Sequence, residues 1–503
     1  MPALFSEIFA LEVFFVIQKN SSYFLCICLI GIILRISGLQ IQSLSMDEVT
    51  EIHIAGLPLL QIIFKKDGFP PLYHLLLSAW MGRFHVAESA RWLSVIFGCL
   101  TIPVIYKLGC LLGKKNSIGL WSAFLLAVSP YHIWYSQEAR AYALFYLVAA
   151  LALYFFFKAM DDNRRRHWLL FSICGVTGIY SHYYFIVLLI CCAFIVLAER
   201  HRWSELKNPM LAFLLIGFFC MPSVVLLQDD MNLQENWPGK RPFDLYALGY
   251  TYFAFLGGLS LGPSMRELHT PRMATVITQI WIWLVLSAGV VFGLVRSWCK
   301  GFQKNNQLEK RLGILLILPL LLCGLLGYCF EVGYNGRYVV WVSIPVYIFL
   351  AMGFAEGTRY TEAKFALLAL CCLFAVSLYN RRCVGRYMNE DVRSVAAYIM
   401  AHSPQGTPAF VQHKSEAKPL AYYLDDSWPV YALHSVKKNG EGLRKALGDL
   451  ENNTKNKKFW FIYTRPFHGD PGGIFKKLLI KKKLVQKQKD CIGIEIYRGE
   501  FPQ

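Results

Sequence analysis

Long hydrophobic stretches recur along most of this chain, and they constrain its fold more than any other feature. Of its 503 residues, 55% are hydrophobic and only 17% are charged, whereas soluble proteins usually carry about 25% charged residues. A helix needs about 20 mostly apolar residues to cross a bilayer. The sequence therefore predicts a mainly α-helical, polytopic transmembrane bundle of about eleven spans. We expect spans at residues 22–39, 90–112, 118–134, 141–158, 168–181, 184–198, 210–227, 274–295, 312–330, 337–356 and 363–379.

Basic loops set the predicted orientation, because short loops rich in Lys and Arg remain in the cytoplasm. When the spans are threaded in order, the basic loops all fall on one side: 114–115, 164–166, 200–207 and 296–311. We therefore expect a multi-pass protein of the cell inner (plasma) membrane with its N-terminus inside. Residues 1–21 lack a basic leader and do not resemble a cleaved signal peptide. The extracytoplasmic parts are then 41–89, the turn before Gln137, 228–273, 331–336 and everything after residue 379.

The composition changes after the last predicted span, which divides the chain into a transmembrane domain (1–380) and a small extracytoplasmic α/β domain (381–503). The second domain carries 22 Lys and Arg against 12 Asp and Glu, more than half of the chain's net charge of +18. A basic domain beside a bilayer is expected to meet anionic lipid headgroups or envelope glycans. We expect no nucleic acid partner, because the domain lies outside and has no recognisable binding motif.

Short strand-like runs alternate with helical segments in this second domain, as in small α/β folds. The expected strands are 409–411, 430–433, 459–463 and 492–497. The expected helices are 392–400, 443–451 and 474–484.

The first external loop, 41–89, is expected to form amphipathic helices on the membrane surface. In a helix starting near Asp47, Asp47 and Glu51 share one face, while Glu48 points about 100° away. A carboxylate at a membrane edge is a suitable general base for a sugar hydroxyl, and Asp47 is the candidate. The alternative is structural, with a carboxylate capping the helix after Ser45.

Two arginines at external ends of spans are candidate phosphate ligands, because the planar guanidinium fits phosphate oxygens. Arg140 lies where the chain re-enters the membrane, and Glu138 could orient it or accept a hydrogen bond from a substrate. The alternative is a surface ion pair between Glu138 and Arg140, which would contribute little. Arg337 begins a later span from the same side, and its alternative is an arginine that snorkels to the interface.

Histidines give a weaker signal. His53, His74, His132 and His182 are scattered, and a lone histidine on an aromatic-rich helix is more often structural than a ligand. His74 and His182 are the favoured candidates among them. Nothing forms an Asp-x-Asp motif, so we expect no metal site and a metal-independent mechanism, although a divalent metal is left open as a cofactor.

The fifteen cysteines predict no disulfide framework. Most of them lie inside predicted spans, where cysteine behaves as a small hydrophobic residue. Cys383 and Cys491 both fall in the external region, and the sequence leaves open whether they pair.

Five short motifs follow one another along the chain. They are Met-Asp-Glu at 46–48, Pro-Pro-Leu-Tyr-His at 70–74, Ala-Arg-Trp-Leu-Ser at 90–94, Ser-Pro-Tyr-His at 129–132 running into 135–142, and Gly-Arg-Tyr at 336–338. In this order they resemble the bacterial branch of the protein mannosyltransferase-like, GT-C fold glycosyltransferases, which is related to the lipid A aminoarabinose transferases. The resemblance covers roughly residues 22–430. It implies an integral membrane glycosyltransferase that moves a hexose or pentose from a polyprenyl-phosphate-linked sugar donor, with inversion, to a lipid, glycan or protein acceptor of the cell envelope.

The resemblance also implies residue roles. In that family the acidic residue of the first external loop is the expected catalytic residue, which assigns Asp47 as general base with Glu48 beside it. Arg140 would hold the carrier phosphate, a leaving group that needs charge stabilisation more than protonation. Phe69 stands where some relatives that modify lipid A have a lysine, which weakens any expectation of aminoarabinose as the sugar. Further substrate-binding candidates in the matching motifs are Glu138, Arg337, His74, Tyr73 and Tyr338.

Two other classes of function fit a chain of this kind. A lipid or solute transporter would suit the number of spans, but transporters usually carry internal repeats and ionisable residues near the membrane midplane. Here the candidate charges gather at the external ends of spans. A catalytically silent subunit for envelope-glycan assembly would have the same fold, and only replacement of Asp47 separates it from the enzyme.

Overall fold

The computed structural model describes residues 21–65, 67–84, 89–234, 245–264, 266–267, 281, 283, 285, 287–292, 295, 306–329, 334–357, 361–454 and 458–501. The chain forms two compact units. The helical unit comprises Met1–Ser37, Ala55–Leu259 and Trp281–Ser377, and the α/β unit comprises Gly38–Ile54, Ser260–Ile280 and Leu378–Gln503.

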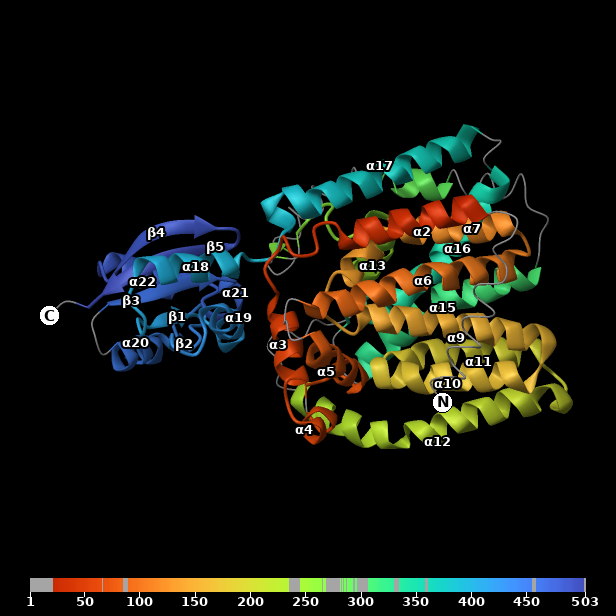
Figure 1. Cartoon of the computed structure of the whole chain (residues 1–503), viewed down its shortest axis with the longest axis horizontal. Coiled ribbons are helices and arrows are strands. Elements are labelled where there is room, and N and C mark those ends of the chain that lie inside the picture. Colours follow the sequence, from red (N-terminus) through yellow and green to blue (C-terminus); the bar gives the residue numbers. More distant parts are fainter. Residues whose placement is uncertain are drawn as a thin grey trace. The chain divides into compact units, whose positions relative to one another are not determined.

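Long helices lie side by side in the helical unit (Figure 1). Helix α9 packs against both α6 and α10, α6 packs against α7, and α2 packs against α6 and α7. The helices are α2 (Ser21–Ile36), α4 (Leu59–Ile63), α5 (Leu72–Phe84), α6 (Ala90–Gly113), α7 (Asn116–Val128), α8 (Pro130–Ser136), α9 (Tyr142–Asp162), α10 (Arg165–Ser181), α11 (Phe185–Glu199), α12 (Trp203–Gln234), α13 (Leu245–Gly257), α15 (Asn306–Cys329), η3 (Gly336–Val342), α16 (Ser343–Gly357) and α17 (Thr361–Cys383).

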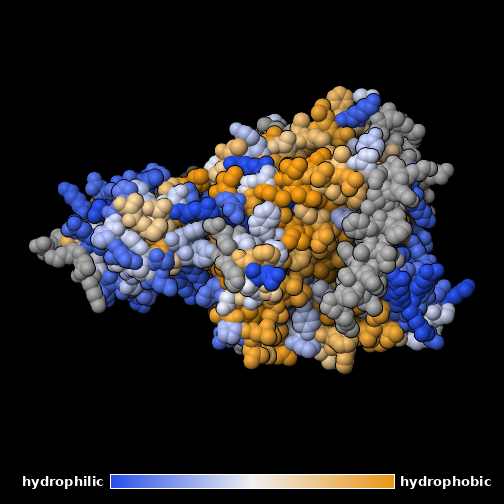
Figure 2. Space-filling view, viewed as in Figure 1, coloured by the Kyte–Doolittle hydropathy of each residue, from blue (hydrophilic) through white to orange (hydrophobic). Residues whose placement is uncertain are grey.

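These helices differ in how much apolar surface they bury. Of the most apolar 18 residues, 83% are buried in α9 but only 17% in α12. Large side chains such as Leu214, Phe218 and Val225 of α12 are exposed, and the visible face of the unit is mainly hydrophobic in Figure 2. Soluble proteins rarely expose apolar patches of this extent. Helix α12 therefore faces lipid, and α9 lies in the core of the bundle.

The prediction of a multi-pass, mainly helical membrane protein is confirmed. Within the described residues, six helices are long and apolar enough to cross a membrane. The predicted total of about eleven spans stays a prediction. The six are Ala90–Gly113, Tyr142–Asp162, Trp203–Leu227, Gln307–Cys329, Gly336–Ala355 and Thr361–Cys383, with shorter apolar helices at Ser22–Ile36, Asn116–Val128 and Phe185–Glu199.

Some predicted segments lie wholly or partly outside the described residues. They are 1–21, the external stretch 228–273, the span 274–295, the basic loop 296–311 and the turn 331–336.

The predicted span 118–134 is divided between α7 and α8. Its second part begins at Pro130, which has no N–H to continue the preceding helix and disfavours helical geometry in the residue before it. The last carbonyls of α7 need other donors, and the fully buried Arg35 of α2 provides them. Its guanidinium donates to the carbonyls of Leu126, at 3.1 Å, and Ala127, at 3.0 Å. A cation at a helix C-terminus is also favoured by the helix dipole.

The α/β unit is built on a five-stranded sheet of order β2-β1-β3-β5-β4. Strand β1 is parallel to both β2 and β3, and β5 is antiparallel to β3 and β4. The elements are α3 (Met46–Ala55), η4 (Gly385–Tyr387), α18 (Val392–His402), β1 (Ala409–Val411), α19 (Lys414–Leu424), β2 (Val430–Ala432), α20 (Leu443–Asn453), β3 (Lys458–Thr464), α21 (Pro466–Gly469), α22 (Ile474–Lys481), β4 (Val485–Cys491) and β5 (Ile494–Glu500).

Both faces of this sheet are covered, which explains why β3 reads as a continuous apolar run. Phe459 and Phe461 point to the face covered by α20 and α22. Trp460 and Ile462 point to the face covered by α18 and α19. Successive side chains of a strand alternate between faces, so one strand contributes to two hydrophobic clusters. The expected small α/β fold is confirmed.

Four elements in the C-terminal part of this unit were missed from the sequence: α19, β4 and the short helices η4 and α21. Strand β4 lies at the edge of the sheet and is almost wholly exposed, with Lys487 and Lys489 on it. Charged edge strands prevent unwanted pairing with other chains, and they lack the alternation of apolar residues that identifies a strand. The helix predicted to reach residue 484 ends at Lys481. Cys383 and Cys491 are not paired.

Candidate functional site

The two arginines that the sequence predicted as phosphate ligands both lie beside the ring of Tyr142 in the helical unit. The guanidinium carbon of Arg140 lies 5.7 Å from the centre of the Tyr142 ring, and that of Arg337 lies 5.6 Å from the same centre. Arg140 also lies 4.5 Å from the Phe69 ring, and Arg337 lies 5.8 Å from Tyr338. Arg140 and Arg337, which are far apart in the sequence, therefore share one aromatic environment.

The backbone around each arginine is fixed locally. The turn before Arg140 is anchored by Gln137, whose side-chain amide donates to the carbonyls of Arg35 at 2.9 Å and Ser37 at 3.1 Å. The N–H of Arg337 donates to the side chain of Asn335 at 3.2 Å, which caps the short helix η3. Both guanidinium groups thus start from well-defined backbone positions.

His182 lies in the turn between α10 and α11, against the same aromatic residues. Its ring is 5.7 Å from that of Phe69, 5.5 Å from that of Tyr338 and 4.8 Å from the stacked ring of Phe145. Burial lowers the pKa of His182 to about 3, and the charges of Arg337 and Arg140 act in the same direction. The imidazole is therefore neutral at physiological pH and adds no further positive charge beside the arginines.

The Pro-Pro-Leu-Tyr-His motif supports this cluster from the first external loop. His74 is buried, with its Nε2 3.2 Å from Oδ2 of Asp67. The other oxygen of Asp67 accepts a hydrogen bond from the N–H of Phe69 at 3.2 Å. Asp67, which the sequence interpretation missed, thereby links His74 to the turn that presents Phe69.

Tyr73 and Glu138 make contacts of a supporting kind. The hydroxyl of Tyr73 lies 2.9 Å from Oγ of Ser94, which in turn donates to the carbonyl of Arg140 at 3.4 Å. Glu138 accepts a hydrogen bond from the indole N–H of Trp134 at 2.6 Å. These two predicted substrate-binding residues thus hold the loop of Arg140 in place.

The α/β unit contains the other candidates, on helix α3. Ser45 and Glu48 form a capping box: the N–H of Ser45 donates to Oε2 of Glu48 at 2.9 Å, and the N–H of Glu48 donates to Oγ of Ser45 at 3.3 Å. This reciprocal pair is a common helix start. Glu48 and Glu51 are buried, and Asp47 is partly exposed. The capping role predicted as the alternative for a carboxylate here is therefore filled by Glu48. The role of Asp47 stays a prediction.

Three carboxylates of the same unit act electrostatically on Arg465, and Asp47 contributes least among them. Burial alone would lower the pKa of Arg465, but the carboxylates of Glu390, Glu416 and Asp47 raise it above its usual value. The guanidinium forms a bidentate ion pair with Glu390, with N–O distances of 2.9 and 2.8 Å. Sequence reasoning missed this arginine, because it is separated from Asp47 by most of the chain.

The remaining candidates are His53 and His132, and the sequence also predicted that no metal site is present. His53 is exposed, and His132 is buried with its Nδ1 2.7 Å from the Arg35 guanidinium. Among the residues that the structure describes, no three His, Cys, Asp or Glu side chains gather as metal ligands would. The metal-independent mechanism stays a prediction.

Residues 69–226 match the family "Dolichyl-phosphate-mannose-protein mannosyltransferase". This segment includes Phe69, the Pro-Pro-Leu-Tyr-His motif and Arg140. No curated protein sequence matches the chain.

Solved structures share its fold. ArnT from Cupriavidus metallidurans in the apo state superposes with a TM-score of 0.64 at 11% identity, covering 97% of this chain and 100% of that one. The same protein bound to undecaprenyl phosphate gives a TM-score of 0.58 at 12% identity, covering 96% and 100%. The oligosaccharyltransferase AglB from Archaeoglobus fulgidus, in complex with an inhibitory peptide and a dolichol-phosphate, gives 0.53 at 12% identity, covering 90% and 70%. The chain thus has the GT-C fold, and the resemblance drawn from its motifs is confirmed.

Proposed function

We propose that this chain with a GT-C glycosyltransferase fold transfers a sugar from a polyprenyl-phosphate carrier to a lipid, glycan or protein acceptor of the cell envelope, with inversion. The observation that carries the proposal is the placement of Arg140 and Arg337 around Tyr142. Undecaprenyl phosphate and dolichol-phosphate are bound by proteins of the same fold. A phosphate on a long apolar chain needs this combination of cationic and aromatic groups beside a lipid-facing bundle.

The two arginines would stabilise the leaving group. When the bond between the sugar and the carrier phosphate breaks, negative charge grows on the phosphate oxygens. Donors already fixed around those oxygens stabilise that charge without reorganising. Arg140 and Arg337 would supply them through their planar forks, and neutral His182 would complete the wall without repelling either cation.

Asp47 would act as the general base. An inverting transfer occurs in one displacement: the acceptor hydroxyl attacks the anomeric carbon, its proton passes to the Asp47 carboxylate, and the carrier phosphate leaves with the bonding electrons. A base that is partly exposed can reach an incoming acceptor, whereas the carboxylate of Glu48 caps α3. We further propose that this chemistry takes place on the extracytoplasmic face of the inner membrane.

The test is transfer of radiolabelled sugar from a panel of polyprenyl-phosphate sugars by membranes containing the protein. The Asp47→Asn variant removes the base while preserving size, and we expect at least about a 100-fold loss of turnover with little change in carrier binding. The matched control is Asp426→Asn, an exposed aspartate of the α/β unit, which should transfer sugar at the wild-type rate.

Each outcome assigns a function class. Transfer that depends on Asp47 establishes the enzyme and identifies the donor sugar. Normal turnover by Asp47→Asn would end the assignment of the base. The folded, membrane-inserted wild-type protein could also transfer no sugar from any donor when envelope acceptors are supplied. That result would contradict the enzyme and favour a transporter or a catalytically silent assembly subunit.

A further inference from the structure

The sheet of the α/β unit has a switch point between β1 and β3. From β1 the chain passes through α19 to β2 on one side, whereas the strands that follow β3 lie on its other side. Strands β1 and β3 are parallel neighbours, so their carboxyl ends meet at one edge. In open α/β sheets, ligands bind in the crevice outside the carboxyl ends of the strands at such a point.

Here that crevice is filled by the chain itself. Residues Leu44, Ser45 and Met46 line one wall of a cavity whose other walls include Arg465, at the end of β3, and Glu416, at the start of α19. The cavity measures about 20 Å³, room for one water molecule. A sugar or a nucleotide does not fit in this space.

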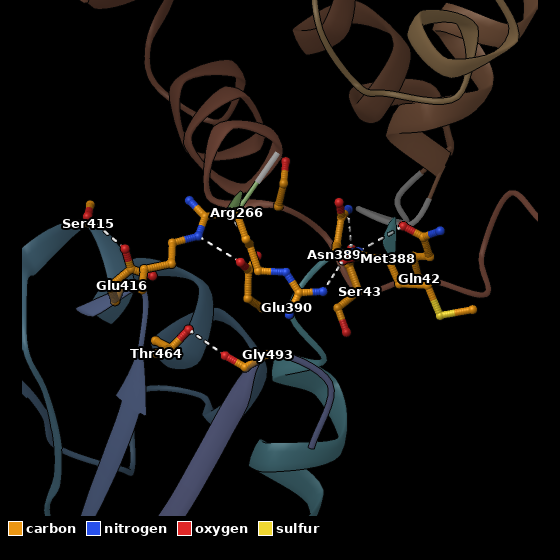
Figure 3. Close-up of polar contacts among 12 residues, drawn as sticks. Gln42, Ser43, Arg266, Met388, Asn389, Glu390, Ser415, Glu416, Thr464 and Gly493 are labelled. Atoms are coloured by element: carbon orange, nitrogen blue, oxygen red, sulfur yellow. Dashed lines mark hydrogen bonds and ion pairs between the residues drawn. The ribbon is translucent and has the colours of Figure 1, made fainter. Parts of the chain in front are cut away.

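Hydrogen bonds fix residues 42–44, which lead into the part of the chain that lines the cavity. Oγ of Ser43 donates to Asp391 at 3.0 Å, and the N–H of Leu44 donates to the hydroxyl of Tyr423 at 2.9 Å. Gln42 accepts from the N–H of Asn389 at 3.1 Å, and Figure 3 shows Gln42 and Ser43 beside Asn389. The segment that precedes Asp47 is therefore a fixed part of the α/β unit, as a bound peptide would be.

Arg465 combines an uncommon backbone conformation with a side chain fixed by an ion pair. Its backbone lies in the left-handed region, with φ of 40° and ψ of 59°, a conformation that non-glycine residues adopt uncommonly. Lys114, Asn163, Asp425 and Lys483 also have positive φ. The bidentate pair with Glu390, which is only 9% exposed, fixes the guanidinium. Strained residues of this kind cluster at functional sites.

We propose that Arg465, held by Glu390, is a positioning residue for Asp47 through the cavity wall that it shares with residues 44–46, and that the switch point of the α/β unit binds residues 43–48 in order to fix the base. The proposal rests on the proposed function of Asp47. It gives the α/β unit a part in the chemical step in addition to any contact with the acceptor. Arg465 acts through Asp47 and does not touch the substrate.

The test compares kcat and KM of full-length Arg465→Gln with those of the wild-type protein in sugar transfer. A displaced base slows the chemical step, so we expect kcat to fall on the order of 10- to 100-fold while KM for the carrier-linked sugar and for the acceptor stays within about twofold. Arg465→Lys keeps the charge but not the fork and should recover part of kcat. The control is Arg444→Gln, an exposed arginine on α20, which should leave both constants unchanged.

A second comparison separates positioning from a general loss of structure. Asp47→Glu moves the carboxylate by one methylene but keeps a basic group, and we expect it to retain measurable transfer. If Arg465 acts through Asp47, adding Arg465→Gln to Asp47→Glu should lower kcat far less than it does in the wild-type background. An equal loss in both backgrounds would overturn the proposal, and it would do so whether or not Arg465→Gln is poorly folded.

The two proposals can fail separately. Absence of Asp47-dependent transfer in the wild-type protein contradicts the proposed function. Asp47-dependent transfer with an undiminished kcat in Arg465→Gln contradicts the positioning role alone. A rise of the acceptor KM with unchanged kcat also contradicts it, because Arg465 would then be an acceptor ligand.

Discussion

Arg140 shows how the setting of a side chain determines what it can bind. Its guanidinium carbon lies over the Phe69 ring, 4.5 Å from the ring centre. A guanidinium gains from such a cation–π contact, and its planar fork matches phosphate oxygens. Phe69 occupies the position at which some relatives place a lysine. Under the proposed function, arginines beside aromatic rings would meet the phosphate charge here.

The first prediction concerns the fork of Arg140. Arg140→Lys preserves the charge but removes the planar pair of donors and the face that packs on Phe69. We expect kcat/KM for the carrier-linked sugar to fall about tenfold or more, because the variant loses about one charge-assisted hydrogen bond to the phosphate. Steady-state transfer with increasing donor measures it, and Arg165→Lys, an exposed arginine at the start of α10, is the control. An unchanged kcat/KM would remove Arg140 from the phosphate site.

At the scale of elements, the sequence predicts what is local and misses what depends on neighbours. Six spans within the described residues were predicted from hydropathy alone, because each is apolar over its own length. The predicted span 118–134 is divided into α7 and α8, a break that the sequence analysis missed although Pro130 is a local signal for it. Its stabilisation by Arg35 of α2 has no local signal. Strand β4 was missed because its exposed lysines reflect its place at the sheet edge.

Arg35 carries the second prediction. It is fully buried and donates to Gly31, Leu126 and Ala127. Arg35→Met fills similar volume but removes these donors. The carbonyl of Leu126 still accepts from the N–H of Ser129, whereas a buried carbonyl left without any partner costs about 1–3 kcal/mol. We expect the unfolding temperature of the purified protein in detergent to fall by several degrees, with Arg165→Met unchanged. Equal unfolding temperatures for Arg35→Met and wild type would show that α7 does not depend on Arg35.

At the scale of the whole molecule, the candidate site could be predicted only in part. The motifs identified Asp47, Arg140 and Arg337, because each stands out in its own stretch of sequence. The sequence could not show that Ser43 bonds to Asp391, 348 residues away, since that pairing depends on how the sheet folds. The same holds for Arg465, which resembles any basic residue of a basic domain until the structure shows its ion pair with Glu390.

The orientation of the chain in the membrane is the last prediction. The basic loops predict that the α/β unit lies outside. Cys383 in this unit is exposed, and Cys110 of α6 is half-buried. A membrane-impermeant maleimide added to intact spheroplasts should therefore modify the peptide that contains Cys383, detected by mass spectrometry. Cys110 lies beside the basic loop 114–115 and should react only after the membrane is permeabilised. Modification of Cys383 only after permeabilisation would reverse the orientation, and would place Asp47, which belongs to the same unit, in the cytoplasm, away from any extracytoplasmic acceptor.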